Sequence, residues 1–191
     1  PYMKPSVGST KLNVCKKICD ALSQDKKVAV VLNAKKELAY RFADMFLAVD
    51  EARKKLGGEV FFVANLDTEK GLPRIRGYAK NILAQLEDEG VLLNSNTGGL
   101  DEYALIGDDL KLPVESFNPD LTVIMGICHA YPDIKEDDIL ITDQPRQLSN
   151  YINSGFPNSV GEISSHSLVM GTDTIIPLET ADTLRELVRE N

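Results

Sequence analysis

The sequence has few cysteines and no long apolar run. Its three cysteines, Cys15, Cys19 and Cys128, form no Cys-x-x-Cys pair and no disulfide framework. The longest apolar runs, such as 121–127, are far shorter than the roughly 18–20 residues that a membrane span needs. The first residues also lack the apolar core of a secretion signal. These absences predict reduced thiols and a cytoplasmic protein without a membrane partner.

Basic residues are in the minority, with 21 Lys and Arg against 29 Asp and Glu and a formal net charge of −8 at pH 7. Nucleic acids and anionic membranes are bound by clustered Lys and Arg, and here the basic residues are interspersed with acidic ones. The charge therefore argues against a nucleic-acid partner and is typical of a soluble protein. A hydrophobic share of 43% is enough for one core, so we expect a single domain over 1–191 with an irregular arm over 1–8.

Strand and helix patterns alternate in the first half of the chain. Continuous apolar runs at 28–32, 60–64 and 91–93 are typical of strands buried on both faces, and they predict strands over 28–32, 59–64 and 91–94. Between them, apolar residues recur every three or four positions, which indicates helices that end near Gly57 and Gly90. This alternation predicts βαβ units, and therefore parallel strands with right-handed crossovers.

The second half of the chain gives weaker signals. We expect a connection without regular structure around Pro113 and Pro119. The other expected elements are strands over 121–125, 138–142 and 174–176 and helices over 9–23, 146–154 and 179–189. The predicted fold class is α/β, with three α/β/α layers and a mostly parallel, Rossmann-like sheet of about five or six strands. This order resembles nucleotide-type domains of larger oxidoreductases and thiamine-dependent enzymes, at the level of the fold alone.

Polar residues follow the predicted strands at the carboxyl edge of the sheet, where open α/β sheets bind ligands. Asn and Thr are also the usual loop and capping residues, so each one alone is weak evidence. Taken together they predict a pocket at this edge. The predicted pocket residues are Asn33, Asn94, Ser95, Thr97, Gly98, Gly99, His129 and Asp143.

The loop over 94–99 is a candidate phosphate cradle. Gly98 and Gly99 allow a nest of backbone N–H groups, and Ser95 and Thr97 add hydroxyl donors. An ordinary surface turn explains the same residues. The chain contains neither a G-x-G-x-x-G fingerprint after a strand nor a GK[ST] P-loop, so the sequence predicts no particular cofactor.

Cys128 and His129 form the most chemically suggestive pair. His129 is the best candidate for a general acid or base because its charge changes near neutral pH, and Asp143 is a second catalytic candidate. With His166 the pair would instead supply ligands for a metal. Cys15 and Cys19, spaced four apart among apolar residues, are expected to pack in the core.

Three functions remain open on this evidence. The first is a binding or catalytic domain for a small anionic or nucleotide-like ligand, with its site at the carboxyl edge. The second is a non-catalytic subunit or assembly domain of a larger complex or homo-oligomer, with the arm over 1–8 and the loop over 155–171 as docking segments. The third is a metal-binding protein that uses Cys128, His129 and His166.

Overall fold

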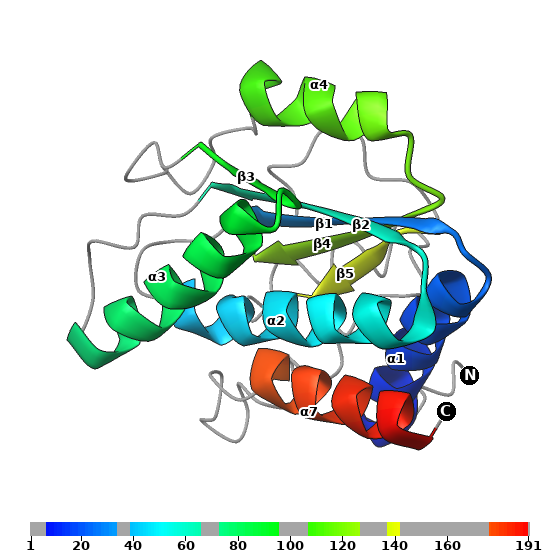
Figure 1. The fold of residues 1–191 in the computed structure, drawn as a ribbon. Coiled ribbons are helices and arrows are strands. Elements are labelled where there is room, and N and C mark those ends of the chain that lie inside the picture. The colour runs from blue at the N-terminus through cyan, green and yellow to red at the C-terminus, as the bar shows by residue number, and fades with distance from the viewer. Residues whose placement is uncertain are drawn as a thin grey trace, which may run out of the picture.

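A computed structural model describes residues 7–33, 39–65, 73–95, 107–126, 137–141 and 176–190 (Figure 1). In chain order its elements are α1 (Val7–Ser23), β1 (Lys27–Asn33), α2 (Ala39–Leu56), β2 (Glu59–Asn65), α3 (Pro73–Asp88), β3 (Leu92–Asn94), α4 (Asp108–Phe117), β4 (Leu121–Gly126), β5 (Ile139–Ile141) and α7 (Ile176–Glu190). Within these ranges, no helix combines the length and apolar character that crossing a bilayer requires.

The five strands form one parallel sheet in the order β3-β2-β1-β4-β5. In the central register, Val30 lies beside Phe62 on one side and Val123 on the other. The prediction of an α/β fold with a parallel sheet of about five strands is therefore confirmed. The strand order changes direction between β1 and β4, which is the place where open α/β sheets bind their ligands.

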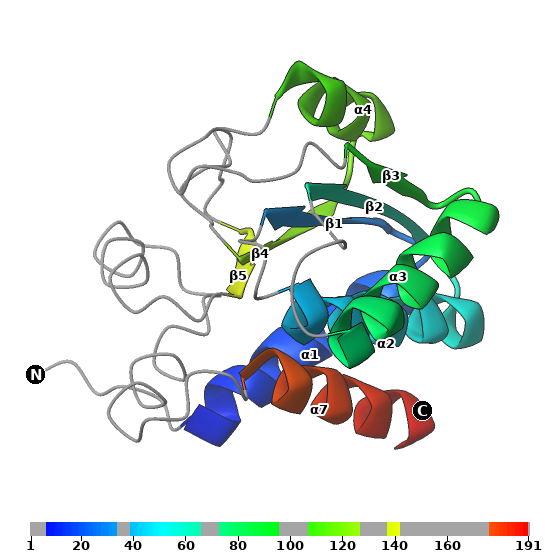
Figure 2. The ribbon, with the colours of Figure 1, turned by 90° about the vertical axis from the view of Figure 1, so that its left-hand side faces the viewer.

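Helices cover both faces of the sheet, but unequally. Figure 2 shows α1, α2, α3 and α7 on one face and α4 on the other. The sequence of β1 is apolar over 28–32 because the side chains of the strand alternate between the two cores. Val28, Val30 and Leu32 belong to the larger core, and Ala29 and Val31 belong to the smaller one.

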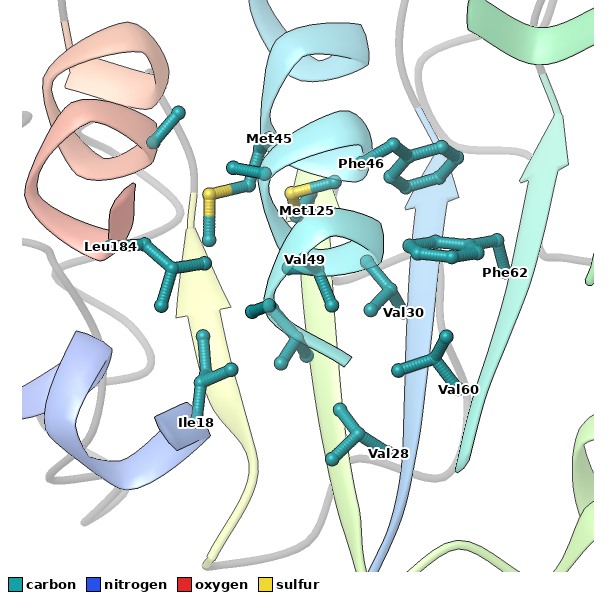
Figure 3. Close-up of a cluster of buried hydrophobic side chains, with 14 of the residues drawn as sticks. Ile18, Val28, Val30, Met45, Phe46, Val49, Val60, Phe62, Met125 and Leu184 are labelled. Carbon is teal, nitrogen blue, oxygen red and sulfur yellow. The ribbon is translucent and has the colours of Figure 1, made fainter. Parts of the chain in front are cut away.

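The larger core joins α1, α2 and α7 to the sheet (Figure 3). The rings of Phe46 on α2 and Phe62 on β2 meet with centroids 4.9 Å apart. Ile18 of α1 and Leu184 of α7 are fully buried in the same cluster. In the smaller core, Leu110 and other apolar residues of α4 pack against strand side chains.

The helix α4 was not expected, because Pro113 lies inside it. Proline inside a helix removes a hydrogen bond and costs about 3 kcal/mol or more. Leu110 and Val114 are four residues apart and both are buried against the sheet, and this burial offsets the cost. The helix ends where Asn118 adopts a left-handed conformation with φ 53°.

Two other boundaries differ from the sequence-based expectation. Ile176 is the first residue of α7, so the expected strand over 174–176 is wrong at that residue. The first helix begins at Val7, two residues earlier than expected. A short apolar run at the start of a helix, such as Ile176 before Pro177, cannot be distinguished in sequence from a short strand, because neither is long enough to show its periodicity.

Replacing Phe46 by alanine tests the larger core. Phe46 is fully buried against Phe62, so Phe46→Ala is expected to lower the free energy of unfolding by about 3–5 kcal/mol. The measurement is urea unfolding followed by circular dichroism. Leu112→Ala is the control, because Leu112 is 56% exposed and its loss should change stability by less than about 0.5 kcal/mol. Equal effects of the two substitutions would contradict the assignment of the core.

Candidate functional site

Three neighbouring strands end in asparagine at the carboxyl edge of the sheet. Asn33 is the last residue of β1, and its backbone lies beside Asn65 of β2 and Gly126 of β4. Asn94, the last residue of β3, pairs with Ala64. Gly126 has a φ of 85°, a conformation that side chains disfavour and that glycine adopts readily.

The structure gives the positions of three residues of the predicted pocket. Asn33, Asn94 and Ser95 lie at the ends of β1 and β3, on the same edge of the sheet. The other predicted pocket residues lie outside the described ranges, as do the metal-ligand candidates Cys128 and His166. The pocket residues concerned are Thr97, Gly98, Gly99, His129 and Asp143. The pocket as a whole therefore stays a prediction, with its sheet edge now located.

Ser95 and Asn65 give this edge its most informative side chains. The backbone N–H of Ser95 donates to the carbonyl of Ala64 at 3.0 Å, which extends the β2–β3 ladder by one residue. The Ser95 Oγ is buried and has no hydrogen-bond partner within the described ranges. Asn65 is 7% exposed. Sequence reasoning did not include Asn65 in the predicted pocket, although it directly follows the apolar run that predicts β2.

Two hollows in the described structure lie elsewhere. One, of about 400 Å³, is at the amino edge and is lined by Lys16, Asp20 and Asp137 among others. There the Lys17 ammonium already donates to the Asp137 carbonyl at 2.8 Å, and the Asp120 carboxylate accepts from the N–H of Lys27. The other, of about 270 Å³, lies between α2 and α7. Neither contains a residue of the predicted pocket.

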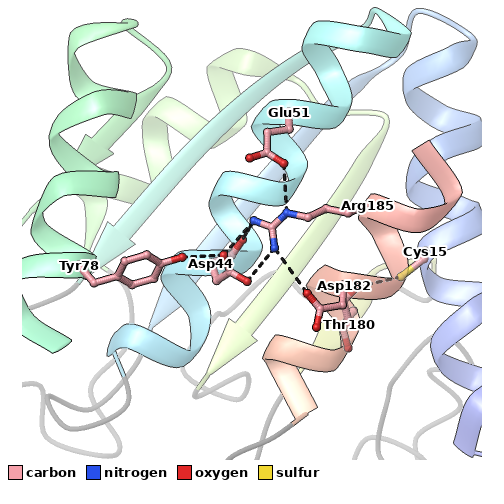
Figure 4. Close-up of polar contacts among 7 residues, drawn as sticks. All are labelled: Cys15, Asp44, Glu51, Tyr78, Thr180, Asp182 and Arg185. Carbon is pink, nitrogen blue, oxygen red and sulfur yellow. Dashed lines mark hydrogen bonds and ion pairs between the residues drawn. The ribbon is translucent and has the colours of Figure 1, made fainter. Parts of the chain in front are cut away.

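A polar network joins α2, α3 and α7 (Figure 4). The Arg185 guanidinium donates to both oxygens of the Asp44 carboxylate, at 2.8 and 2.9 Å, and to Glu51 Oε2 at 3.1 Å. The Tyr78 hydroxyl donates to Asp44 Oδ1 at 2.7 Å. Sequence reasoning missed this network, because Arg185 and Asp44 are 141 residues apart and no local pattern relates them.

The network shifts the pKa values of its members. Burial alone would raise the pKa of Asp44, but hydrogen bonds from Arg185 and Tyr78 outweigh it and lower that pKa. Burial and the bond to Asp44 raise the pKa of Tyr78 to about 12. Arg185 also lies 3.8 Å from Asp182, so its donors already face carboxylates. We interpret the network as a structural tie between α7 and α2.

The buried cysteines follow the sequence-based expectation. Cys15 and Cys19 are 0% and 4% exposed and pack in the larger core. Burial raises the pKa of Cys15 to about 12 and that of Cys19 to about 11, so both thiols stay protonated at neutral pH. The Cys15 Sγ lies 3.4 Å from the carbonyl of Thr180 on α7. Among the described residues, no group of three or more His, Cys, Asp or Glu is arranged to hold a metal ion.

Comparison with known proteins gives three curated relatives. Each is named component CfbD of the Ni-sirohydrochlorin a,c-diamide reductive cyclase complex. The chain is 37% identical to that of Methanosarcina acetivorans and 33% identical to that of Methanothermobacter thermautotrophicus, in each case over 99% of this chain. It is 34% identical to that of Methanocaldococcus jannaschii over 92% of this chain.

The chain spans about half the length of these relatives, 53%, 53% and 48% respectively. No protein-family model matches the sequence, and no solved structure matches it. The similarity covers nearly all of this chain, so the fold described above corresponds to one part of each relative.

Arg185→Met tests the network between α7 and α2. Because the pKa of Asp44 is lowered in the folded state, its pairing stabilises the fold fully above its usual pKa, about 3.9, and less as the pH falls through the lowered value. We expect Arg185→Met to cost about 2 kcal/mol at pH 7 and clearly less at pH 3. Urea unfolding at both pH values measures this.

The matched control is Arg189→Met, one turn further along α7, where the arginine is exposed. It should change stability little at either pH. If Arg185→Met lowered the free energy of unfolding equally at pH 7 and pH 3, Arg185 would stabilise the fold through packing of its aliphatic stem, and its charge would contribute nothing.

Proposed function

We propose that this chain is part of a subunit of a reductive cyclase complex that acts on a nickel tetrapyrrole. The observation that carries the proposal is the similarity to three CfbD proteins, at 33–37% identity over nearly the whole chain. The second hypothesis from the sequence, a complex subunit, is thereby combined with the first, a ligand-binding domain.

The fold supports a ligand at the carboxyl edge. Asn33 of β1 and Gly126 of β4 meet where the strand order changes direction, and open α/β sheets bind small molecules at this position. The substrate in the relatives' name is a tetrapyrrole with two of its carboxyl groups converted to amides. Such a macrocycle offers several polar groups around one apolar ring, and an edge of asparagine and serine residues suits those polar groups.

His129 is our candidate for proton transfer in this site. A reductive cyclisation adds electrons and protons to its substrate, and an imidazole changes its charge near neutral pH. His129 follows the end of β4 by three residues in the sequence, and this spacing is the basis for the candidate role. Asp143 follows β5 by two residues and is the second candidate.

An assembly subunit without substrate contact is the second candidate function, because the relatives are named as components of a complex. The two candidate functions, substrate binding and assembly, differ in the role that they give to His129. An assembly subunit tolerates its loss, whereas a substrate-binding subunit loses turnover.

The test compares His129→Ala with His166→Ala in the complex reconstituted with its partner components. We expect His129→Ala to slow conversion of Ni-sirohydrochlorin a,c-diamide by about 10²–10⁴-fold, the usual effect of losing a general acid or base. His166→Ala should leave the rate within a few-fold. Absorbance of the tetrapyrrole follows the reaction.

Unchanged rates in both variants, with the complex intact on size exclusion, would favour the assembly subunit. Parallel losses of activity and of bound metal in both variants would favour the metal-binding hypothesis instead. A complex that converts no tetrapyrrole with the unaltered chain present would contradict the proposal.

A further inference from the structure

The buried hydroxyl of Ser95 has an unmet capacity for hydrogen bonds. Its Oγ is inaccessible to solvent and has no partner in the described part of the chain, although the backbone N–H of Ser95 is bonded to Ala64. A buried polar group left unpaired is costly, and most such groups in proteins have a partner. A hydroxyl can both donate and accept a hydrogen bond. Its missing partner is therefore a hydrogen-bond donor, an acceptor, or a group that contains both.

Ser95 and Asn65 lie next to each other on the α4 face of the sheet. Asn94 pairs with Ala64, so the next step of the parallel ladder places Ser95 beside Asn65. Strand side chains alternate between faces, and Val63, two residues before Asn65, packs with Leu110 of α4. Asn65 and Ser95 are therefore neighbours at the carboxyl ends of β2 and β3, and their side chains lie on the same face of the sheet.

The beginning of α4 points toward this same edge. Its last residue, Phe117, sits at the amino edge, where its ring and carbonyl contact Lys27, the first residue of β1. Figure 1 shows α4 running back along the sheet, so the start of this helix of 10 residues, which is about 15 Å long, lies toward the carboxyl edge.

The charges that the described residues place at this end of the α4 face are negative. Asp108 and Asp109 occupy the exposed first turn of α4. Among the described residues of α4 and the five strands, the cations are Lys111, which pairs with Glu115 at 3.8 Å, and Lys27 at the opposite edge. Arg74 and Arg76 belong to α3, which covers the other face of the sheet. A carboxylate of the ligand would meet like charge here, whereas a neutral amide would not.

We propose that the Ser95 hydroxyl, with Asn65 beside it, binds a primary carboxamide of the ligand and selects it over a carboxylate. A carboxamide has an NH₂ donor and a carbonyl acceptor, so either end pairs with the hydroxyl. This inference rests on the proposed function, in which the ligand is a tetrapyrrole with two carboxamides. It assigns to Ser95 the recognition of the amidated tetrapyrrole over the same tetrapyrrole without the amides.

The test is a titration of the purified full-length protein with two probes, Ni-sirohydrochlorin a,c-diamide and Ni-sirohydrochlorin, followed by tetrapyrrole absorbance. The diamide should bind at least about tenfold more tightly, the effect of one hydrogen bond together with the avoided like charge. Ser95→Ala should reduce this preference by about three- to tenfold, because the hydrogen bond is lost while Asp108 and Asp109 still repel a carboxylate. Ser116→Ala, an exposed serine on α4, is the matched control and should keep the preference.

Unfolding of the Ser95→Ala variant separates recognition from a structural role. Because folding leaves this hydroxyl unpaired, its removal should not lower the urea midpoint. A clearly lowered midpoint would show that the hydroxyl has a structural partner, and it would overturn the inference. Equal binding of both probes to the unaltered protein would also overturn it while the proposed function stands. Binding of neither probe would contradict the proposed function, and the inference with it.

Discussion

Burial of the central strands on both faces is the constraint on which the rest of the structure depends. β1 and β4 carry apolar residues on both sides, so helices must cover both faces, and the crossovers that supply those helices make the strands parallel. Parallel strands in register end at one edge. The backbones of Asn33, Asn65 and Gly126 therefore lie side by side, although they are far apart in sequence.

The two edges of the sheet consequently have different roles. At the amino edge, charged side chains stabilise the ends of elements: the fully buried Asp50 pairs with Arg53 at 2.7 Å and with Lys54 at 3.0 Å, and both cations reach Glu89 after α3. At the carboxyl edge, the described polar side chains of Asn94 and Ser95 are neutral. Charges that satisfy one another contribute to stability, whereas a buried hydroxyl without a partner costs free energy until it acquires one.

The structural features that could be predicted from the sequence are those that depend on local periodicity. β1, β2, β3 and the helices between them are strongly patterned, and the i, i+4 spacing of Cys15 and Cys19 correctly predicted burial in a helix. Asn33 and Asn94 were placed at the carboxyl edge because they follow apolar runs. Pro113 concealed α4, since its local preference against a helix opposes the burial of Leu110, which only the folded sheet supplies. The pairing of Arg185 with Asp44 and the unpaired state of Ser95 likewise depend on contacts between distant segments.

Hydrogen exchange of the protein with and without Ni-sirohydrochlorin a,c-diamide tests the central claim most directly, namely that the carboxyl edge of this sheet binds the ligand. The account predicts slower exchange in peptides that contain the strand ends at Asn33, Asn65, Ser95 and Gly126, with peptides of the amino edge unchanged. Protection confined to the hollow beside Lys16 and Asp20, or to the groove between α2 and α7, would contradict it.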